Sequence, residues 1–160
     1  MEKRPDLNIR KTEIADLDVL FQFQLDEQAG YLAAFMPKDY TNRAAYLSKF
    51  SKLLADPSVN NQTIRIGDAI VGHVAKFVLH GDTEITYWID RSYWGQGIAT
   101  QALSAFLLIE TDRPVFARVA FDHVASQRVL EKCGFLKIAS DRGFANARQQ
   151  EIVEWIYRLD

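Results

Sequence analysis

Two glycines, Gly95 and Gly97, stand between a stretch typical of a β-strand and one typical of an amphipathic helix. Residues 84–89 are rich in β-branched and aromatic side chains and predict the strand. Apolar residues then recur at helical spacing from Ala99 to Leu107, which predicts the buried stripe of the helix. Glycine lets the backbone approach a ligand at such a turn, and the first N–H groups of a helix have no intrahelical partner. The turn is therefore a candidate anion site, although an ordinary tight turn explains the same glycines.

Two common nucleotide-binding loops do not match this turn. A dinucleotide-binding loop needs a third glycine and a following strand–helix–strand unit with an acidic residue for the ribose, and neither is clear here. A Walker loop needs Gly-Lys-Ser or Gly-Lys-Thr, which the turn lacks. We therefore expect it to hold something other than a mononucleotide.

The size and charge of the chain narrow the classes of protein to which it can belong. Its 160 residues, 48% of them hydrophobic, suit one domain over residues 1–160 with a sizeable core. The 19 basic and 21 acidic residues give a net charge of −2, so we expect neither nucleic acid nor a membrane as a partner. The stretch Met1–Asp6 lacks the apolar region of a secretory signal, and no run approaches the ~20 apolar residues of a membrane span. We expect a soluble protein.

Cysteine and histidine usage argues against a disulfide framework and a metal site. Cys133 is the only cysteine, which excludes an internal disulfide and a multi-thiolate zinc site, so a cytoplasmic location is the simplest interpretation. His73, His80 and His123 are scattered without a metal-ligand spacing, and we expect no bound metal. Cys133 is interpreted as a small buried residue rather than a nucleophile.

Hydrophobic periodicity predicts an α+β order of elements. The predicted strands cover residues 7–10, 62–66, 69–78, 84–89, 115–120, 135–138 and 151–157. Four helices are predicted. The first ends near Leu25, the second begins near Asn42, and the third follows the glycine turn. The fourth runs from Val124 to Cys133, where Gly134 ends it. The three strands between residues 62 and 89 are joined by short glycine turns and predict an antiparallel meander. The whole order indicates an α+β fold with a mixed sheet.

The helix predicted from Val124 to Cys133 carries a second pattern. Ser126 lies near its start, and the pair Gly134-Phe135 follows its end. Taken with the glycine turn, this pattern resembles the GNAT superfamily of acetyl-CoA-dependent N-acetyltransferases. It is most similar to the branch that contains the ribosomal-protein N-terminal acetyltransferases of the RimJ and RimL type. The resemblance extends from Leu7 to Tyr157.

Both motifs depart from the family pattern in places. In the first, Trp94 stands where the family has Gln or Arg, and an aromatic residue there is usual in the ribosomal-type branch. In the second, His123 replaces the usual Asn and Leu130 replaces the usual Tyr. That tyrosine often protonates the leaving thiolate in relatives, so the resemblance assigns the role to Ser126 instead, as in branch members with a serine there.

The resemblance implies a GNAT-like fold, with a mixed, mostly antiparallel central sheet of about seven strands and helices on both faces. It also implies acetyl-CoA as co-substrate. Its pantetheine arm would lie like an extra strand beside residues 88–90, and its pyrophosphate would sit on the backbone amides of residues 95–100. The implied cofactor-binding residues are Trp88, Ile89, Asp90, Trp94, Gly95, Gln96, Gly97, Ile98, Ala99, Thr100, His123 and Ser126.

The implied chemistry is direct transfer of an acetyl group from a thioester to a primary amine in a ternary complex. An amine with a pKa near ~10 must lose a proton before it attacks, and the resemblance makes Glu84 the candidate base. The family stabilises the oxyanion with a backbone N–H near Trp88 or Ile89, where a β-bulge commonly splays the strand from its neighbour. Ser126 or a water would protonate the departing thiolate.

Each role has a plainer alternative. Glu84 could be a solvated strand charge, and Ser126 could only hydrogen-bond to backbone in the first turn of its helix. His123 is interpreted as a helix-start residue without a chemical part, although its ordinary pKa permits proton transfer. Asp122 is interpreted as the N-cap of that helix. Three aromatic residues are interpreted as core or cofactor packing: Tyr87, Trp88 and Trp94.

The acceptor amine is expected to enter opposite the cofactor, between the early helices and the last two strands. Candidates for the wall that it meets are Tyr31, Phe35, Met36 and Tyr40, which could equally pack the core. The branch resemblance suggests a protein N-terminus as acceptor. Related members acetylate small molecules such as polyamines, antibiotics and amino acids. A polyamine pocket should be acidic, and Asp26 and Glu27 give only a modest indication of one. The chain could be a monomer or a homodimer.

Two other functions compete with catalysis. A catalytically silent acyl-CoA sensor would keep the fold, and the altered positions of His123 and Leu130 motivate this alternative. A phosphate-binding regulatory domain unrelated to CoA would use the same glycine turn for nucleotides.

Overall fold

The computed structural model describes residues 6–160, which form seven strands and five α-helices. Residues 1–5, which belong to the N-terminal stretch without a predicted secretory signal, lie outside the described residues. The strands are β1 (Leu7–Lys11), β2 (Asn60–Ile66), β3 (Ala69–Leu79), β4 (Asp82–Ile89), β5 (Val115–Ala120), β6 (Leu136–Ala145) and β7 (Gln150–Leu159). The helices are α1 (Leu17–Gln24), α2 (Glu27–Ala33), α3 (Arg43–Ala55), α4 (Ile98–Ile109) and α5 (Val124–Lys132).

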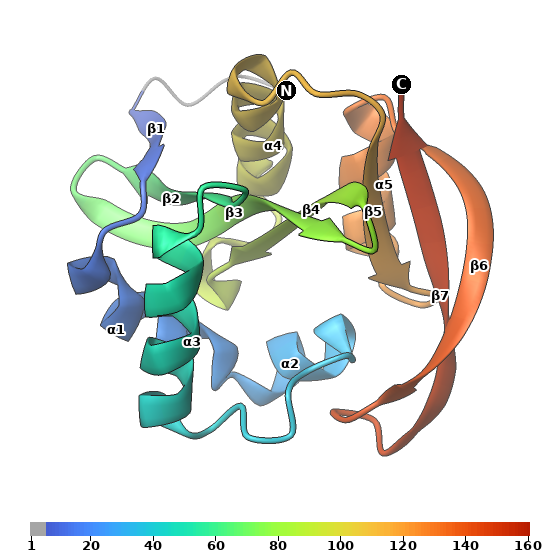
Figure 1. The fold of residues 1–160 in the computed structure, drawn as a ribbon, viewed down its shortest axis with the longest axis horizontal. Coiled ribbons are helices and arrows are strands. Elements are labelled where there is room, and N and C mark those ends of the chain that lie inside the picture. Colours follow the sequence, from blue (N-terminus) through green and yellow to red (C-terminus); the bar gives the residue numbers. More distant parts are fainter. Residues whose placement is uncertain (1–5) are drawn as a thin grey trace.

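All seven strands join one sheet in the order β1-β2-β3-β4-β5-β7-β6 (Figure 1). Neighbouring strands are antiparallel except β4 and β5, which are parallel. The predicted meander is confirmed as β2, β3 and β4. The α+β, mostly antiparallel sheet that the family resemblance implies is the one observed.

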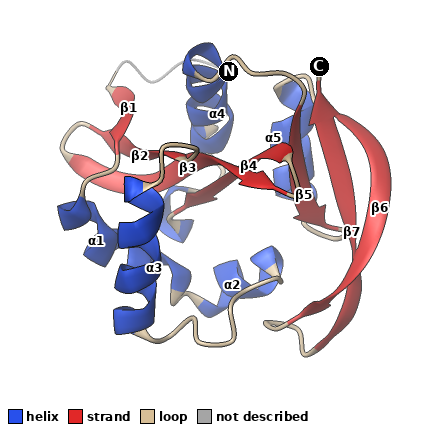
Figure 2. Ribbon diagram, in the orientation of Figure 1, coloured by secondary structure: helices blue, strands red, loops and turns tan. Residues whose placement is uncertain are grey.

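Helices cover both faces of the sheet (Figure 2). On one face, Leu103 and Phe106 of α4 and Leu130 of α5 are buried against inward side chains of the central strands, among them Ile85 and Val115. On the other face, α1 and α3 make a smaller cluster. Each fully buried side chain of this size contributes about 1.5–3 kcal/mol. The larger core therefore fixes α4, and with it the glycine turn, against β4.

The two central strands, β4 and β5, run together for a very short distance. Their register contains a single pair, Glu84 with Phe116, whereas β4 stays paired with β3 along its length and β5 with β7. The sheet is thus open in its middle beyond Glu84. The expected β-bulge is not found in the described β3–β4 ladder, whose register runs without a shift. The strands separate without an interruption in β4, which stays paired with β3 while β5 stays paired with β7.

The last hairpin is longer than the sequence predicts. Expected strands over 135–138 and 151–157 are observed as β6 and β7, each ten residues long. β6 is at the edge of the sheet and nearly all its side chains are exposed. A strand without a buried face needs no alternation of apolar and polar residues, which is why the pattern missed its second half.

Within residues 6–160, no helix combines the length and the apolar character needed to cross a membrane.

Candidate functional site

The glycine turn lies directly after β4, at the start of α4. Gly95 and Gly97 both have left-handed backbone angles, with φ of 77° and 75°, and Gly97 is the N-cap residue of α4. These angles favour glycine because a Cβ would crowd the backbone. The first N–H groups of α4, from Ile98 to Thr100, are left without intrahelical partners by helix geometry. Because the Ile98 side chain is buried in the core, only its backbone faces a ligand here.

The Trp94 side chain connects this turn to the end of β4 by a hydrogen bond. Its Nε1 donates to the carbonyl of Ile89 at 2.9 Å. The carboxylate of Asp90 accepts a hydrogen bond from the Ser92 hydroxyl at 2.7 Å and caps the short turn that leads to the glycines. Trp88, Ile89 and Asp90 are therefore contiguous with the turn, as the resemblance implies. The turn and strand end form one backbone-lined surface.

Strand alternation distinguishes two candidate backbone donors in β4. The Asp90 N–H donates to the Val71 carbonyl on β3 at 2.8 Å. In an antiparallel pair, N–H groups two residues apart point the same way. The Trp88 N–H is therefore directed to β3, while the Ile89 N–H is directed to the open side facing β5. Of the two donors expected from the sequence, Ile89 is the one that can face a ligand.

Ser126 meets a tyrosine from the opposite side of the opening. The Tyr87 hydroxyl lies 2.7 Å from Ser126 Oγ and donates to the Ser126 carbonyl at 3.1 Å. This contact joins the first turn of α5, which follows β5, to β4. Leu130, at the family's tyrosine position, is 1% exposed and lies in the core. The phenol beside Ser126 thus comes from β4, and burial raises the pKa of Tyr87 far above its ordinary value.

His123 begins α5, but the predicted capping role of Asp122 is wrong. The N-cap residue is His123, which makes no side-chain capping bond. Asp122 instead forms a two-pronged ion pair with Arg148, whose Nη1 and Nη2 each lie 2.8 Å from a carboxylate oxygen. A rigid bidentate guanidinium competes better for the carboxylate than a single backbone N–H does. Burial lowers the pKa of His123, which leaves the ring neutral at neutral pH.

Glu84 is 4% exposed, so it is not the solvated strand charge that the plainer alternative describes. Arg118 of β5 lies across from it, with Nε 3.7 Å from the Glu84 carboxylate. The same guanidinium contacts Glu154 at 2.9 Å and Asp141 at 3.3 Å. Burial raises the pKa of Glu84 above its ordinary value, and the charge of Arg118 partly opposes the rise. Glu84 is thus a buried carboxyl at the closed end of the opening.

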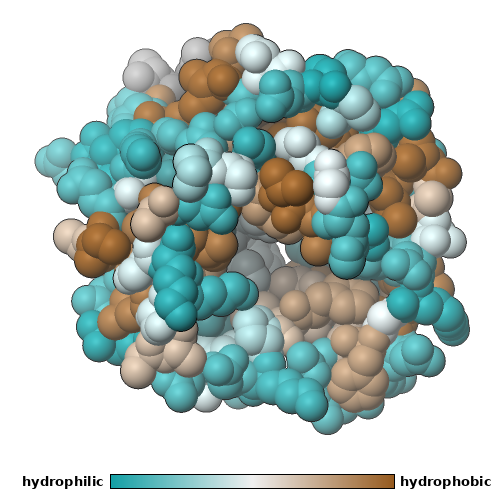
Figure 3. Space-filling view, viewed as in Figure 1, coloured by the Kyte–Doolittle hydropathy of each residue, from teal (hydrophilic) through white to brown (hydrophobic). Residues whose placement is uncertain are grey.

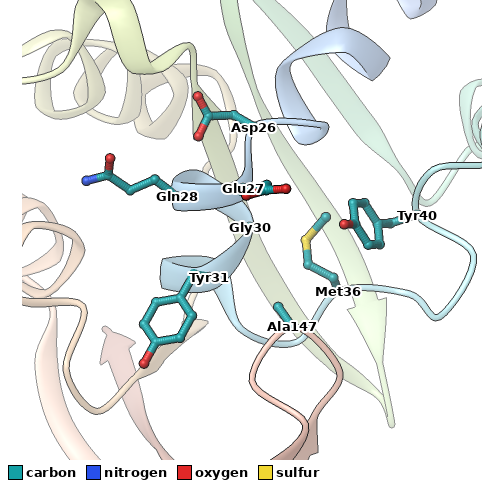
Figure 4. A pocket seen from close by; sticks show the side chains of 8 residues that line it. All are labelled: Asp26, Glu27, Gln28, Gly30, Tyr31, Met36, Tyr40 and Ala147. Carbon is teal, nitrogen blue, oxygen red and sulfur yellow. The ribbon is translucent and has the colours of Figure 1, made fainter.

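The expected acceptor wall surrounds a cavity of about 510 Å³ beside α2 (Figure 4). Tyr31, Met36 and Tyr40 line it, and Glu27 extends toward Met36 and Tyr40. Phe35 does not line this cavity, because its ring lies against Gly143 of β6. Three of the four expected wall residues are therefore brought together.

Two arginines hold residues that line this cavity. Arg91 Nε lies 2.6 Å from the Asp26 carboxylate, which also caps α2 by accepting from the Ala29 N–H. Arg148 donates to the Tyr31 carbonyl at 2.6 Å, and its guanidinium lies 4.0 Å above the Tyr31 ring. The charge of Asp26 is thus already balanced within the protein.

Cys133 is partly buried, and burial raises the pKa of its thiol. Its Sγ lies 3.6 Å from Ser104 Oγ and 3.7 Å from the Thr100 carbonyl. These contacts join the C-terminal end of α5 to α4.

The chain matches the family described as the acetyltransferase (GNAT) domain over residues 6–136. It belongs to the GNAT acetyltransferase family. Its relatives include the uncharacterized N-acetyltransferase p20 of Bacillus licheniformis, which is 24% identical over 96% of this chain and 92% of the relative.

Among solved structures, the microcin self-immunity acetyltransferase MccE, in complex with acetyl-CoA and AMP, has a TM-score of 0.80 and 16% identity, with 97% of this chain and 92% of that chain covered. The ribosomal-protein α-N-acetyltransferase RimL, in complex with coenzyme A, has a TM-score of 0.79 and 18% identity, with 95% and 93% covered. The family predicted from the two motifs is confirmed, and a ribosomal-protein acetyltransferase is among the structural neighbours.

Sequence reasoning missed the residues that act as partners at this GNAT site. Arg118 and Arg148 belong to no motif in the sequence, and the interpretation of Tyr87 as core or cofactor packing does not include its contact with Ser126. Arg118 alternates with buried residues in β5, so a lone charge in an otherwise apolar strand was an available signal. The contacts of Tyr87 and Arg148 join positions far apart in the chain and leave no local pattern.

Proposed function

We propose that this protein is an N-acetyltransferase that moves an acetyl group from acetyl-CoA directly to a primary amine. The observation that carries the proposal is the opening between β4 and β5, which lies beside the glycine turn in a chain of the GNAT family. The pantetheine arm of the cofactor would lie along the open edge of β4. Its pyrophosphate would take the N–H groups at the start of α4, where backbone donors and the helix dipole favour an anion.

The remaining residues fit the steps of the transfer. Glu84 would accept a proton from the amine through a chain of waters, because it lies five residues before Ile89 on β4, about 16 Å away at ~3.3 Å per residue. Burial already favours a proton on this carboxyl. The amine nitrogen then bonds to the thioester carbon, and the Ile89 N–H would donate to the resulting oxyanion. When that intermediate collapses, the carbon–sulfur bond breaks. The thiolate would take a proton from Ser126, which Tyr87 holds in place. The second proton that the nitrogen loses as the amide forms would restore Ser126 through water.

Glu84→Gln tests this assignment. It keeps the shape of the side chain and removes its ability to take a proton, so release of free CoA thiol should slow about 10²- to 10⁴-fold with a panel of amines. Glu151→Gln makes the same chemical change on an exposed position of β7 and serves as the control. Equal rates in the two variants would refute the role of Glu84.

A catalytically silent acyl-CoA sensor is the second candidate. It is favoured by Leu130, a buried core residue at the position where the family usually carries a tyrosine. Calorimetric binding of acetyl-CoA without thiol release, for any amine in a panel of peptides, polyamines and amino acids, would select the sensor.

A further inference from the structure

A second cavity, of about 520 Å³, lies between α3 and the face of the sheet formed by β3 and β4. Its walls combine several aromatic rings with aliphatic, polar and charged side chains. Tyr46 and Phe50 of α3 stack with ring centroids 4.3 Å apart, and the Phe50 ring meets His73 of β3 edge-on at 6.5 Å. Trp88 of β4 lines the same cavity. The space-filling surface is hollowed near the middle of the face that looks onto α2 and α3 (Figure 3). A cavity of this size and lining suits a small organic group.

This cavity reaches the strand on which the proposed transfer takes place. Thr86 and Trp88 line it, and they follow Glu84 along the same face of β4, since alternate residues of a strand share a face. The cavity also shares Met36 and Tyr40 with the cavity beside α2. A group seated here would hold an attached amine next to β4.

One polar group in this aromatic wall has no partner. His73 lines the cavity, yet its Nδ1 is buried and makes no hydrogen bond to any residue that the structure describes. Burial lowers the pKa of His73 to about 4, so the ring is neutral at neutral pH. Buried polar groups are normally paired, and each exception asks for an explanation. Because Nδ1 is closed off from solvent, the ring can meet a ligand only through its other nitrogen, Nε2. A hydroxyl can donate or accept, so it suits either tautomer of the ring.

This cavity carries little net charge for a polycation, because Asp39 and Asp56 in its lining are accompanied by Lys49. Asp26 is paired with Arg91. Asp56, at the cavity rim, accepts from the backbone and the hydroxyl of Ser58 at 2.9 and 2.8 Å. A polyamine needs several free carboxylates, whereas an aromatic ring needs the apolar walls that are present.

We propose that the acceptor is a primary amine joined by a short chain to a hydroxylated aromatic ring. The ring occupies the cavity between Phe50 and Trp88, and its hydroxyl bonds to His73. The inference rests on the proposed function and specifies its acceptor. Tyramine has this chemistry, and so does an N-terminal tyrosine of a peptide.

The first test compares tyramine with phenethylamine, which lacks the hydroxyl. The unmodified protein should show a kcat/KM about tenfold higher for tyramine, as one hydrogen bond allows. His73→Leu should abolish this preference, so that tyramine and phenethylamine have equal kcat/KM values. It should not lower the unfolding temperature, because it removes an unpaired nitrogen. A purely structural role for His73 predicts equal losses for both amines.

The second test fills the cavity. Ala45 of α3 lines it and is partly exposed, so Ala45→Phe places a ring there without disturbing the core. Ala44→Phe adds the same bulk at the exposed neighbouring position, which does not line the cavity, and is the control. Ala45→Phe should lower kcat/KM for tyramine at least tenfold, with CoA affinity unchanged. Ala44→Phe should behave like the unmodified protein.

Further acceptor amines distinguish a peptide acceptor from a small molecule, and failure of the ring site from failure of acetyl transfer. A tripeptide that begins with tyrosine distinguishes a peptide acceptor from a small amine, and either result supports the ring site. Faster acetylation of spermidine than of tyramine, or an Ala45→Phe variant with unchanged tyramine turnover, would overturn it while leaving acetyl transfer intact. Failure of the proposed function is a different result, namely no CoA binding or no transfer to any amine. In the absence of turnover, calorimetry of tyramine against the CoA-loaded protein still decides whether the cavity binds the ring.

Discussion

Replacing Gly97 with alanine tests whether the glycine turn holds the cofactor. Gly97 has φ 75° and ψ 11°, in the left-handed region. An L-residue in this region costs about 1–2 kcal/mol. For a chain of this size, each kcal/mol lowers the unfolding temperature by about 2–4 °C. Gly97→Ala should therefore remain folded and unfold about 2–8 °C lower.

The effect on the cofactor should be much larger than the effect on stability. The new methyl group would stand where the turn is proposed to meet the pyrophosphate and would lengthen at least one backbone hydrogen bond to it. A hydrogen bond to a charged group contributes about 1.5–3 kcal/mol, so its loss weakens CoA binding about 10- to 150-fold. Isothermal titration calorimetry with CoA measures this directly.

Gly81→Ala is the matched control. Gly81 has φ 83° and open space around its Cα, but it lies in the turn between β3 and β4, at the opposite end of β4. It should show a similar fall in unfolding temperature with unchanged CoA affinity. If Gly97→Ala bound CoA as tightly as Gly81→Ala, the glycine turn would be an ordinary tight turn and not the site of the pyrophosphate.

Three further predictions concern the site and its supports. The kcat/KM of the unmodified protein should fall as pH drops through the raised pKa of Glu84. Arg118→Leu removes the charge that opposes this rise and should move the acid limb of the kcat/KM profile to higher pH. Arg118→Lys keeps a positive charge and should restore the original acid limb. Tyr87→Phe removes the hydroxyl 2.7 Å from Ser126 Oγ and should lower kcat about five- to tenfold with an unchanged KM for acetyl-CoA; an unaltered kcat would contradict the positioning role. Gly72→Ala would put a Cβ 2.1 Å from a backbone carbonyl oxygen of β4, so thermal denaturation should show a loss above 2 °C together with weaker CoA binding.

Much of the fold follows from the sequence because most elements have a buried face. The meander, α4 and α5 each show the period of their structure, and the glycines marked their ends. The edge strand β6 shows no such period, since most of its side chains meet water on both faces. The prediction that Asp122 is an N-cap is wrong for a related reason. A local capping pattern was present, but Arg148, distant in sequence, supplied the stronger partner.

The site was predicted as a set of segments rather than as a set of contacts. The family motifs placed the glycine turn and Ser126, because each is a short stretch with fixed spacing. Tyr87 and Ser126 are 39 positions apart, and their contact depends on how β4 and β5 diverge. The sequence could not predict that His73 Nδ1 lacks a partner either, because this depends on which hydrogen-bonding groups the fold places near it.

The opening between β4 and β5 also bears on the behaviour of the protein in a crowded solution. A sheet that is parted in its middle has two inner edges in addition to its outer ones, and free strand edges are the usual templates for unwanted pairing between chains. Here the inner edges face each other across a wedge whose apex is the Glu84–Phe116 pair, and β4 and β5 are each paired on their other side. A single extended molecule is narrow enough to enter the gap between β4 and β5, whereas the β-sheet of another chain is too wide to pair with either inner edge. The same geometry that exposes backbone groups thus protects the protein from aggregating through them.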